Sequence, residues 1–301
     1  MSFRFGVPAI VLLASVVFGQ QQRDLRLDKG PVVNGAPNGS PRIPRGYAVV
    51  IGIAHYKHLS DGQQLQFAER DVEAVYSGLI SPEGGNFRAE NVHKLSGAKA
   101  TLRAIRHELE EWLPSVATED DRVLVYFAGH GFVKEGKPYL APYDLDPADI
   151  PATGYSMNSL GAALRSKIKA RWKVLLTDAC HSGAINPEAD VAAINRSLMD
   201  LDESLFSLTA SRDRERSFES ADWGGGHGIF TYYVVKGLEG SADENTDGII
   251  TADELAEYVR RNVREATRGL QNPTSERASF DPGMLLAYVP SNRTPDFPPP
   301  P

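Results

Sequence analysis

The chain has 301 residues, of which 42% are hydrophobic and 24% are charged, and its only cysteine is Cys180. This composition excludes a fibrous protein, a multi-pass membrane protein and a wholly disordered chain. The formal net charge is −7, the pI is near 5.6 and no run of basic residues occurs, so no nucleic-acid partner is expected. A single cysteine excludes both an internal disulfide and a thiolate-rich zinc site.

The first 19 residues have the pattern of a secretory signal peptide. Arg4 precedes an uncharged apolar stretch over residues 5–19, and the small residue Gly19 stands before three glutamines. The stretch is shorter than the roughly 20 residues that a membrane-spanning helix needs, and an uncleaved membrane anchor is the alternative. We therefore predict a secreted or periplasmic protein with no stable membrane span after the signal is removed.

Proline-rich segments flank the part of the chain that is expected to fold. Residues 20–45 predict a flexible linker and residues 290–301 a Pro-rich tail, which leaves one folded domain over 46–289.

Short apolar runs alternate with amphipathic runs inside this domain. The runs VLVYFA and VLLT are apolar on both faces, which is typical of central strands in a parallel sheet covered by helices on each side. The alternation predicts an α/β layered fold. The strands are expected at 47–53, 91–95, 122–128, 172–178, 205–210 and 284–289, and the helices at 65–79, 102–113, 159–168, 228–238 and 252–266.

Two of the expected strands end in reactive side chains among small residues. His130 closes the segment YFAGHG (126–131), and Cys180 lies in TDACHSG (177–183). Ligands bind at the carboxyl ends of strands in such sheets, so the two side chains share one crevice if the strands are neighbours. An imidazole beside a thiol favours the thiolate and then protonates a leaving amine. The N–H groups of Gly131 and Cys180 are the predicted oxyanion donors.

Each reactive residue also has an ordinary alternative role. A free cysteine is most often a small buried hydrophobe, and His130 could be a loop histidine that caps a strand. His181 competes with His130 for the role of base, although in an extended segment its side chain and that of Cys180 point to opposite faces. His227, in the glycine-rich stretch WGGGHG, is a further candidate for a loop contact.

Six collinear segments resemble the caspase-like cysteine peptidases and, among them, the metacaspase group of bacteria, plants and protozoa. His130 lies fifty residues before Cys180, the separation known for caspases. The resemblance implies a three-layer sandwich with a mostly parallel six-stranded central sheet and helices on both faces. It also implies an endopeptidase with a dyad of Cys180 and His130. The segments are YAVVIGIAHY (47–56), FAERDVEAV (67–75), VYFAGHG (125–131), TDACHSG (177–183), SLTASRDRERSFE (207–219) and GIFTYYVVKGL (228–238).

By the same resemblance, Asp178 and Asp71 lie where metacaspases place acidic residues at the base of the primary specificity pocket. Two confined carboxylates favour a guanidinium or an ammonium and reject a carboxylate, so cleavage is expected after Arg or Lys. The alternatives are a strand-end residue that accepts backbone hydrogen bonds for Asp178 and a solvated helix charge for Asp71. Ala68 and Arg70 depart from the Cys and Asn of the metacaspase pattern.

The segment from Ile185 to Glu203 resembles the linker that caspase-like zymogens cut between their two halves. Arg196 lies within it and is the candidate site of self-cleavage, because a basic residue in an exposed loop would suit the predicted specificity.

The stretch DENTDGIITADE (243–254) fits the twelve-residue EF-hand loop, with Gly248 at the position of the sharp turn. Helix capping is the alternative, because Thr251 and Glu254 form a capping box before the helix expected at 252–266. We predict that the loop binds Ca²⁺, which the peptidase chemistry itself does not require. The predicted ligands are Asp243, Asn245, Asp247, the carbonyl of Ile249, Thr251 and Glu254.

These patterns leave three functions open. The first is a secreted caspase-like cysteine endopeptidase, modulated by calcium, whose partners are proteins or peptides with a basic residue before the scissile bond. The second is a catalytically silent, calcium-binding caspase-fold module that recruits partners. The third is a thiol redox sensor, for which the chain lacks a resolving cysteine.

Overall fold

The computed structural model describes residues 44–179, 193, 205–212, 215, 217–275 and 281–289. Contacts divide the chain into Met1–Arg42 and Ile43–Pro301, and every described residue belongs to the second unit. The predicted signal peptide 1–19, almost all of the linker 20–45 and the tail 290–301 therefore lie outside the described residues and stay predictions. The same holds for Cys180, His181 and Arg196.

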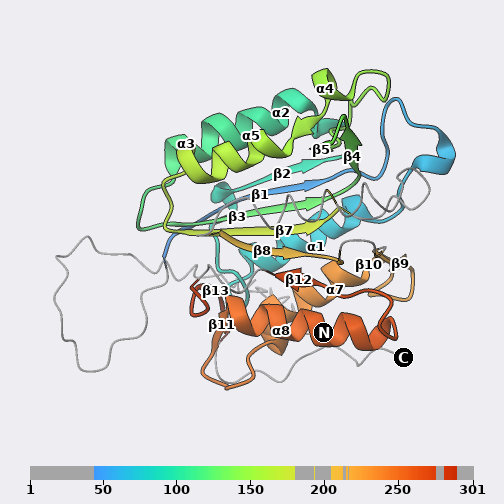
Figure 1. The fold of residues 1–301 in the computed structure, drawn as a ribbon. Helices are drawn as coiled ribbons and strands as arrows, with labels where there is room; N and C mark the ends of the chain where they lie inside the picture. Colours follow the sequence, from blue (N-terminus) through green and yellow to red (C-terminus); the bar gives the residue numbers. More distant parts are fainter. Residues whose placement is uncertain are drawn as a thin grey trace, which may run out of the picture. The chain divides into compact units, whose positions relative to one another are not determined.

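A six-stranded sheet forms the middle layer of the fold (Figure 1). Its strands are β1 (Gly46–Gly52), β2 (Val92–Ser96), β3 (Arg122–Ala128), β7 (Trp172–Asp178), β8 (Leu205–Thr209) and β12 (Thr274–Ser275). The spatial order is β12-β8-β7-β3-β1-β2, and only β12 pairs in the antiparallel direction. Every residue of β1 and β3 is buried, which explains why these strands are apolar on both faces. The predicted mostly parallel, six-stranded sheet is confirmed.

Helices cover both faces of this sheet, so the predicted three layers are also confirmed (Figure 1). On one face lie α2 (Leu102–His107), α3 (Leu113–Val116), α5 (Met157–Ala162) and the short α4 (Ile150–Thr153). On the other face lie α1 (Ala68–Ile80), α7 (Ile229–Lys236) and α8 (Ala252–Ala266). Helix α7 packs against both α1 and α8. Among the described residues, no helix combines the length and the apolar character that crossing a membrane requires.

In the described part of the chain, three small sheets lie outside the central one. The first contains β4 (Gly131–Lys134), β5 (Lys137–Leu140) and β6 (Tyr155–Ser156); the second pairs β9 (Glu219–Ser220) with β10 (His227–Gly228); the third pairs β11 (Ile249–Thr251) with β13 (Leu285–Tyr288). Two of these sheets include candidate site residues or their neighbours. β4 directly follows His130, and β10 contains His227.

The strands expected at 47–53, 91–95 and 205–210 differ from β1, β2 and β8 by one residue at their ends, whereas one helix and one strand differ by more. The helix expected at 65–79 begins only at Ala68, and the N–H groups of Gln66 and Phe67, which precede it, donate to the carboxylate of Glu219. The run expected as a strand at 284–289 is β13, which pairs with β11 outside the central sheet. The remaining place in the central sheet belongs to the two-residue strand β12, which is too short to give a sequence pattern.

The other expected helices are present, with small changes at their ends. The helix predicted at 252–266 is α8, residue for residue. The remaining three are partly π-helical, in the segments Glu108–Trp112, Ala163–Lys167 and Gly237–Ser241.

Candidate active site

The strands that lead to the two predicted catalytic residues are neighbours. β3 and β7 pair in parallel as far as Ala128 opposite Asp178, and the Gly129 amide then donates to the Asp178 carbonyl oxygen at 3.2 Å. The expectation of adjoining strand ends is confirmed. His130 follows one of these ends by two residues, and Cys180 follows the other by two residues. Because Cys180 lies outside the described residues, its distance from His130 stays a prediction.

The imidazole of His130 is buried and held in one orientation. The residue is 1% exposed, and its ring Nε2 lies 2.7 Å from the carbonyl oxygen of Gln63. A carbonyl oxygen only accepts hydrogen bonds, so Nε2 must carry the proton in this contact. In the neutral ring the lone pair is then on Nδ1. Nδ1 is therefore the nitrogen that can take a proton from a thiol.

Aromatic side chains contact the His130 ring. The Tyr56 ring is stacked on it with centroids 5.0 Å apart, and the Phe132 ring lies in an edge-type arrangement with centroids 6.1 Å apart. The Tyr56 hydroxyl also accepts a hydrogen bond from the backbone N–H of His130 at 2.7 Å. The neighbouring Gly131 is buried and begins β4 opposite Leu140. Its role as an oxyanion donor stays a prediction.

The structure brings Asp71 and Asp178 together. Both residues are fully buried, Asp71 in the first turn of α1 and Asp178 at the end of β7. A Cβ atom built on Gly228 would lie 2.6 Å from a carboxylate oxygen of Asp178 and 3.2 Å from one of Asp71, so both carboxylates approach the same point. The alternative of a solvated helix charge is therefore wrong for Asp71. Binding of a substrate by this pair stays a prediction.

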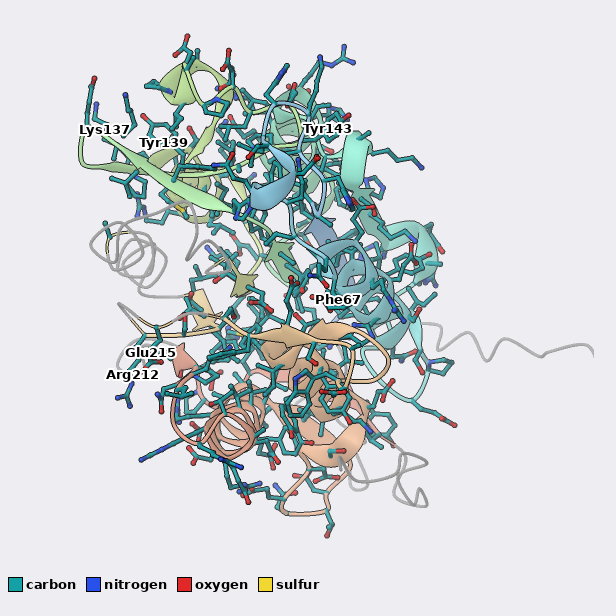
Figure 2. All side chains as sticks on the ribbon, turned by 90° about the vertical axis from the view of Figure 1, so that its right-hand side faces the viewer. Phe67, Lys137, Tyr139, Tyr143, Arg212 and Glu215 are labelled. Carbon is teal, nitrogen blue, oxygen red and sulfur yellow. The ribbon has the colours of Figure 1, made fainter. Side chains whose placement is uncertain are left out.

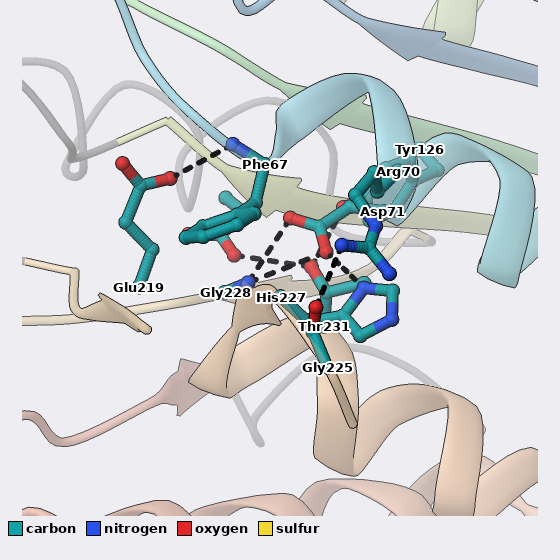
Figure 3. Close-up of polar contacts among 10 residues, drawn as sticks. Phe67, Arg70, Asp71, Tyr126, Glu219, Gly225, His227, Gly228 and Thr231 are labelled. Atoms are coloured by element: carbon teal, nitrogen blue, oxygen red, sulfur yellow. Dashed lines mark hydrogen bonds and ion pairs between the residues drawn. The ribbon is translucent and has the colours of Figure 1, made fainter. Parts of the chain in front are cut away.

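Asp71 is bonded to the segment that precedes α7 (Figure 3). It accepts hydrogen bonds from the Gly228 amide at 3.2 Å and from His227 Nδ1 at 2.8 Å. The expected loop contact of His227 is thus confirmed, with a carboxylate as its partner. Arg70 donates to the carbonyl of Gly225 at 2.6 Å and holds the same segment. Residues 224–226 all have positive φ, a conformation in which glycine is unstrained.

Asp178 is bonded to hydroxyl groups. Its two carboxylate oxygens accept from Ser217 Oγ at 2.6 Å and from Thr231 Oγ1 at 3.1 Å. The Thr231 hydroxyl is in turn 2.6 Å from the hydroxyl of Tyr126. Burial, and then the charges of Asp71 and Asp178, raise the pKa of Tyr126 well above its ordinary value. Tyr126 therefore remains a neutral phenol beside the two carboxylates.

The segment that carries Ser217 is fixed by residues that follow α8. Gln271 donates to Ser217 Oγ at 3.1 Å and accepts from the Phe218 amide at 2.8 Å. The Glu215 carboxylate accepts from the amide and side chain of Asn272 at 2.6 and 2.7 Å. Glu215 lies beside Arg212 (Figure 2) and also accepts a hydrogen bond from the backbone amide of that residue. These contacts place the Ser217 hydroxyl over the end of β7.

The sequence interpretation missed several residues that surround the candidate catalytic groups. Tyr56 and Gln63 contact His130, while Ser217 and Thr231 contact Asp178. Tyr56, Ser217 and Thr231 lie inside segments that carry the family resemblance, and that position was the available signal. Nothing in the sequence marked the carbonyl of Gln63.

The predicted calcium loop forms a tight turn before α8. The Asp243 carboxylate accepts from the amides of Asp247 and Gly248 at 3.1 and 2.9 Å. Glu254 accepts from the amide and hydroxyl of Thr251, so the capping box is present. In the described part of the chain, no group of three or more His, Cys, Asp or Glu side chains is arranged to hold a metal ion. The calcium site stays a prediction, for which Glu254 would have to turn from Thr251 to the loop.

The layered sheet and these adjoining strand ends define a caspase-type α/β domain. A family model described as the caspase domain (peptidase C14) matches residues 45–282, and the chain belongs to this family. It is thus a caspase-family cysteine peptidase, with proteins as its substrates.

Comparison with solved structures supports the fold. The crystal structure of caspase-1 from Spodoptera frugiperda is similar, with a TM-score of 0.51 and 15% sequence identity over 88% of this chain and 98% of that one. A comparison with curated proteins finds no match.

Proposed function

We propose that this protein is a metacaspase-type endopeptidase that cleaves after Arg or Lys with a dyad of Cys180 and His130. The observation that carries the proposal is the hydrogen bonding of the His130 ring together with the position of this residue relative to the sheet. The Nε2–H of His130 donates a hydrogen bond to the Gln63 carbonyl. His130 also follows β3, which pairs with β7, the strand that leads to Cys180. Membership of the caspase family supports the reaction class, and the buried pair of Asp71 and Asp178 supports the basic specificity.

The proposed reaction uses both nitrogens of His130. Nδ1 takes the thiol proton of Cys180, and the thiolate adds to the scissile carbonyl carbon. The N–H groups of Gly131 and Cys180 stabilise the oxyanion. The imidazolium then gives its Nδ1 proton to the leaving amine, and a water molecule deprotonated by the same nitrogen hydrolyses the thioester. The Gln63 carbonyl accepts a hydrogen bond from Nε2–H throughout and stabilises the imidazolium.

A basic substrate side chain would be recognised by Asp71 and Asp178. Hydrogen bonds between a carboxylate and a guanidinium are shorter and stronger than neutral ones, and the low exposure of this pair strengthens them further. Both carboxylates already accept donors from the chain, with His227 and Gly228 on Asp71. An incoming Arg or Lys must replace some of these contacts. We therefore expect the segment His227–Gly228 to shift when substrate enters.

The direct test is an assay of the purified full-length chain with peptides that carry Arg, Lys or Asp before the scissile bond. Turnover of the Arg and Lys peptides is expected, with none of the Asp peptide. The Cys180→Ala variant should be inactive on all three. Turnover of basic peptides that persists in this variant would contradict the proposal.

We also propose that the loop Asp243–Glu254 binds Ca²⁺ and stabilises one end of the sheet. Oxygen-bearing residues occupy the ligand positions of the loop. The loop contains β11, which pairs with β13, and the carbonyl of Leu286 in β13 accepts from the buried guanidinium of Arg122 in β3. An ion in the loop would thereby act on the strand that precedes His130.

Calcium is expected to raise the melting temperature of the full-length chain by about 2–4 °C when its concentration is roughly ten times the dissociation constant. At that concentration an ion that binds only the folded state stabilises this state by about 1.4 kcal/mol. Thermal unfolding in CaCl₂ and in EGTA measures the effect. Asp243→Asn should remove the difference, whereas Asp222→Asn, at an exposed position outside the loop, should keep it. Equal melting temperatures of the unmodified chain in both buffers would contradict calcium binding.

A further inference from the structure

The loop between β1 and α1 holds His130 at two points. Its Gln63 carbonyl faces the ring Nε2, and its Tyr56 hydroxyl faces the backbone N–H of the same residue. Tyr56 follows the carboxyl end of β1, which is the neighbour of β3 on the side opposite to β7. A third strand end thus contributes to the position of the candidate base, although the proposed reaction uses only the Gln63 carbonyl of the loop that follows it.

The hydroxyl of Tyr56 satisfies a buried amide. His130 comes after the last paired residue of β3, and its N–H donates to this hydroxyl at 2.7 Å. A buried donor that loses its acceptor costs about 1–3 kcal/mol. Tyr56 is itself 4% exposed, and burial raises the pKa of its phenol well above the ordinary value. The hydroxyl is therefore retained as a neutral acceptor over the pH range of any enzyme assay.

Gly129 leaves the space that this hydroxyl occupies. A Cβ atom at residue 129 would lie 2.6 Å from the hydroxyl oxygen of Tyr56, closer than real Cβ contacts allow. The glycine before His130 is thus explained by the close approach of Tyr56, since φ at this residue is not positive. A side chain at residue 129 would push the hydroxyl away from the His130 amide.

The side chain of Gln64 fixes the loop from within. Its Oε1 accepts from the Tyr56 amide at 2.7 Å, and its Nε2 donates to the carbonyls of Tyr56 at 3.1 Å and Leu59 at 2.9 Å. The residue next to it, Gln63, supplies the carbonyl for the His130 ring. One half-buried amide side chain therefore fixes the backbone of Tyr56 to the segment that carries the Gln63 carbonyl.

We infer that Tyr56 is a positioning residue of the peptidase and that Gln64 sets the loop from which Tyr56 and the Gln63 carbonyl orient His130. The inference rests on the proposed function, because it takes His130 as the base. Removal of the hydroxyl leaves the buried N–H of His130 unsatisfied, and the residue moves to find another acceptor. Displacement of a catalytic group by about 1 Å can cost 10²-fold in rate.

The test compares Tyr56→Phe, Gln64→Glu and Gly129→Ala with the control Tyr47→Phe. Tyr56→Phe keeps the stacked ring and removes only the hydroxyl. Tyr47 is a buried residue at the opposite end of β1, so its variant controls for the removal of a tyrosine hydroxyl that does not contact His130. Gln64→Glu keeps the acceptor for the Tyr56 amide but turns the donor into a carboxylate oxygen that faces two carbonyls.

The measured quantities are KM and the kcat per competent site. The competent sites are counted by titration with an irreversible thiol-directed inhibitor. Tyr56→Phe and Gln64→Glu should each lower kcat about tenfold with unchanged KM, as expected for loss of about 1.4 kcal/mol of positioning. Gly129→Ala should act in the same direction, and Tyr47→Phe should match the unmodified chain.

A purely structural role would lower the number of titrated sites and the melting temperature while kcat per site stayed constant, and that result would overturn the inference. If Tyr56→Phe fails to fold, kcat per site of Gln64→Glu decides the question in the same way. Failure of the proposed function has a different signature, because the unmodified chain would then not turn over basic peptides or Cys180→Ala would remain active.

Discussion

Replacement of His130 by alanine is expected to lower kcat for cleavage of an Arg peptide by about 10²–10⁴-fold, the usual contribution of a positioned general acid–base. The reason is that the Nδ1 of this ring is the proposed proton acceptor for the thiol and the donor to the leaving amine. Steady-state kinetics of the purified variant measures the loss. The backbone N–H of residue 130 and its contact with Tyr56 are kept in this variant, so the strand end should remain in place.

The matched control for this change is His58→Ala. His58 is exposed and lies in the same β1–α1 loop that contacts His130. Its removal should leave kcat unchanged. A His130→Ala variant that is folded and retains full activity would show that another base acts, with His181 as the first candidate. If both Cys180→Ala and the unmodified chain are inactive toward every peptide, the non-catalytic partner-recruiting module becomes the better interpretation.

Neutralisation of Asp178 or Asp71 is expected to lower the ratio of kcat/KM for an Arg peptide to kcat/KM for the same peptide with citrulline by about 10²-fold. The reason is that a hydrogen bond to a charged partner contributes about 1.5–3 kcal/mol. Citrulline has the shape of arginine without its charge. The ratio of the two kcat/KM values therefore reports charge recognition separately from any loss of active protein. Asp178→Asn and Asp71→Asn are the variants to measure.

The control for these variants is Asp222→Asn, at an exposed position in the segment between β9 and β10. It should leave the Arg-to-citrulline ratio unchanged. An unchanged ratio in Asp178→Asn and Asp71→Asn would contradict their role in specificity. The buried pair would then serve only to tie β7 and α1 to the segment that contains Gly228.

The parts of the fold with a strong local signal were predictable from the sequence. β3 and β7 are apolar on both faces, so their burial in a parallel sheet follows from the sequence alone, and both sets of bounds are correct. α8 is likewise marked by its capping box of Thr251 and Glu254. The adjacency of β3 and β7 is not fixed by local pattern, and before the structure it was only the condition for a shared crevice.

The contacts around the candidate site were not predictable, because they join residues far apart in the chain. The Tyr56 hydroxyl meets an amide 74 residues later, and Ser217 meets a carboxylate 39 residues earlier. No local pattern marks such a pair before the sheet order is known. The short strand β12 could not be found for a related reason, since two residues held in place by β8 carry no periodicity of their own.

The most direct test of the central claim is the rate at which an Arg-containing peptidyl acyloxymethyl ketone labels the thiol of Cys180, with the site identified by peptide mass mapping. The chain has one cysteine, so a labelled sulfur is unambiguous. The proposed dyad predicts rapid labelling of Cys180 in the unmodified chain and labelling slowed by at least about 10²-fold in His130→Ala. Equal labelling rates in the two proteins, or label on a residue other than Cys180, would contradict it.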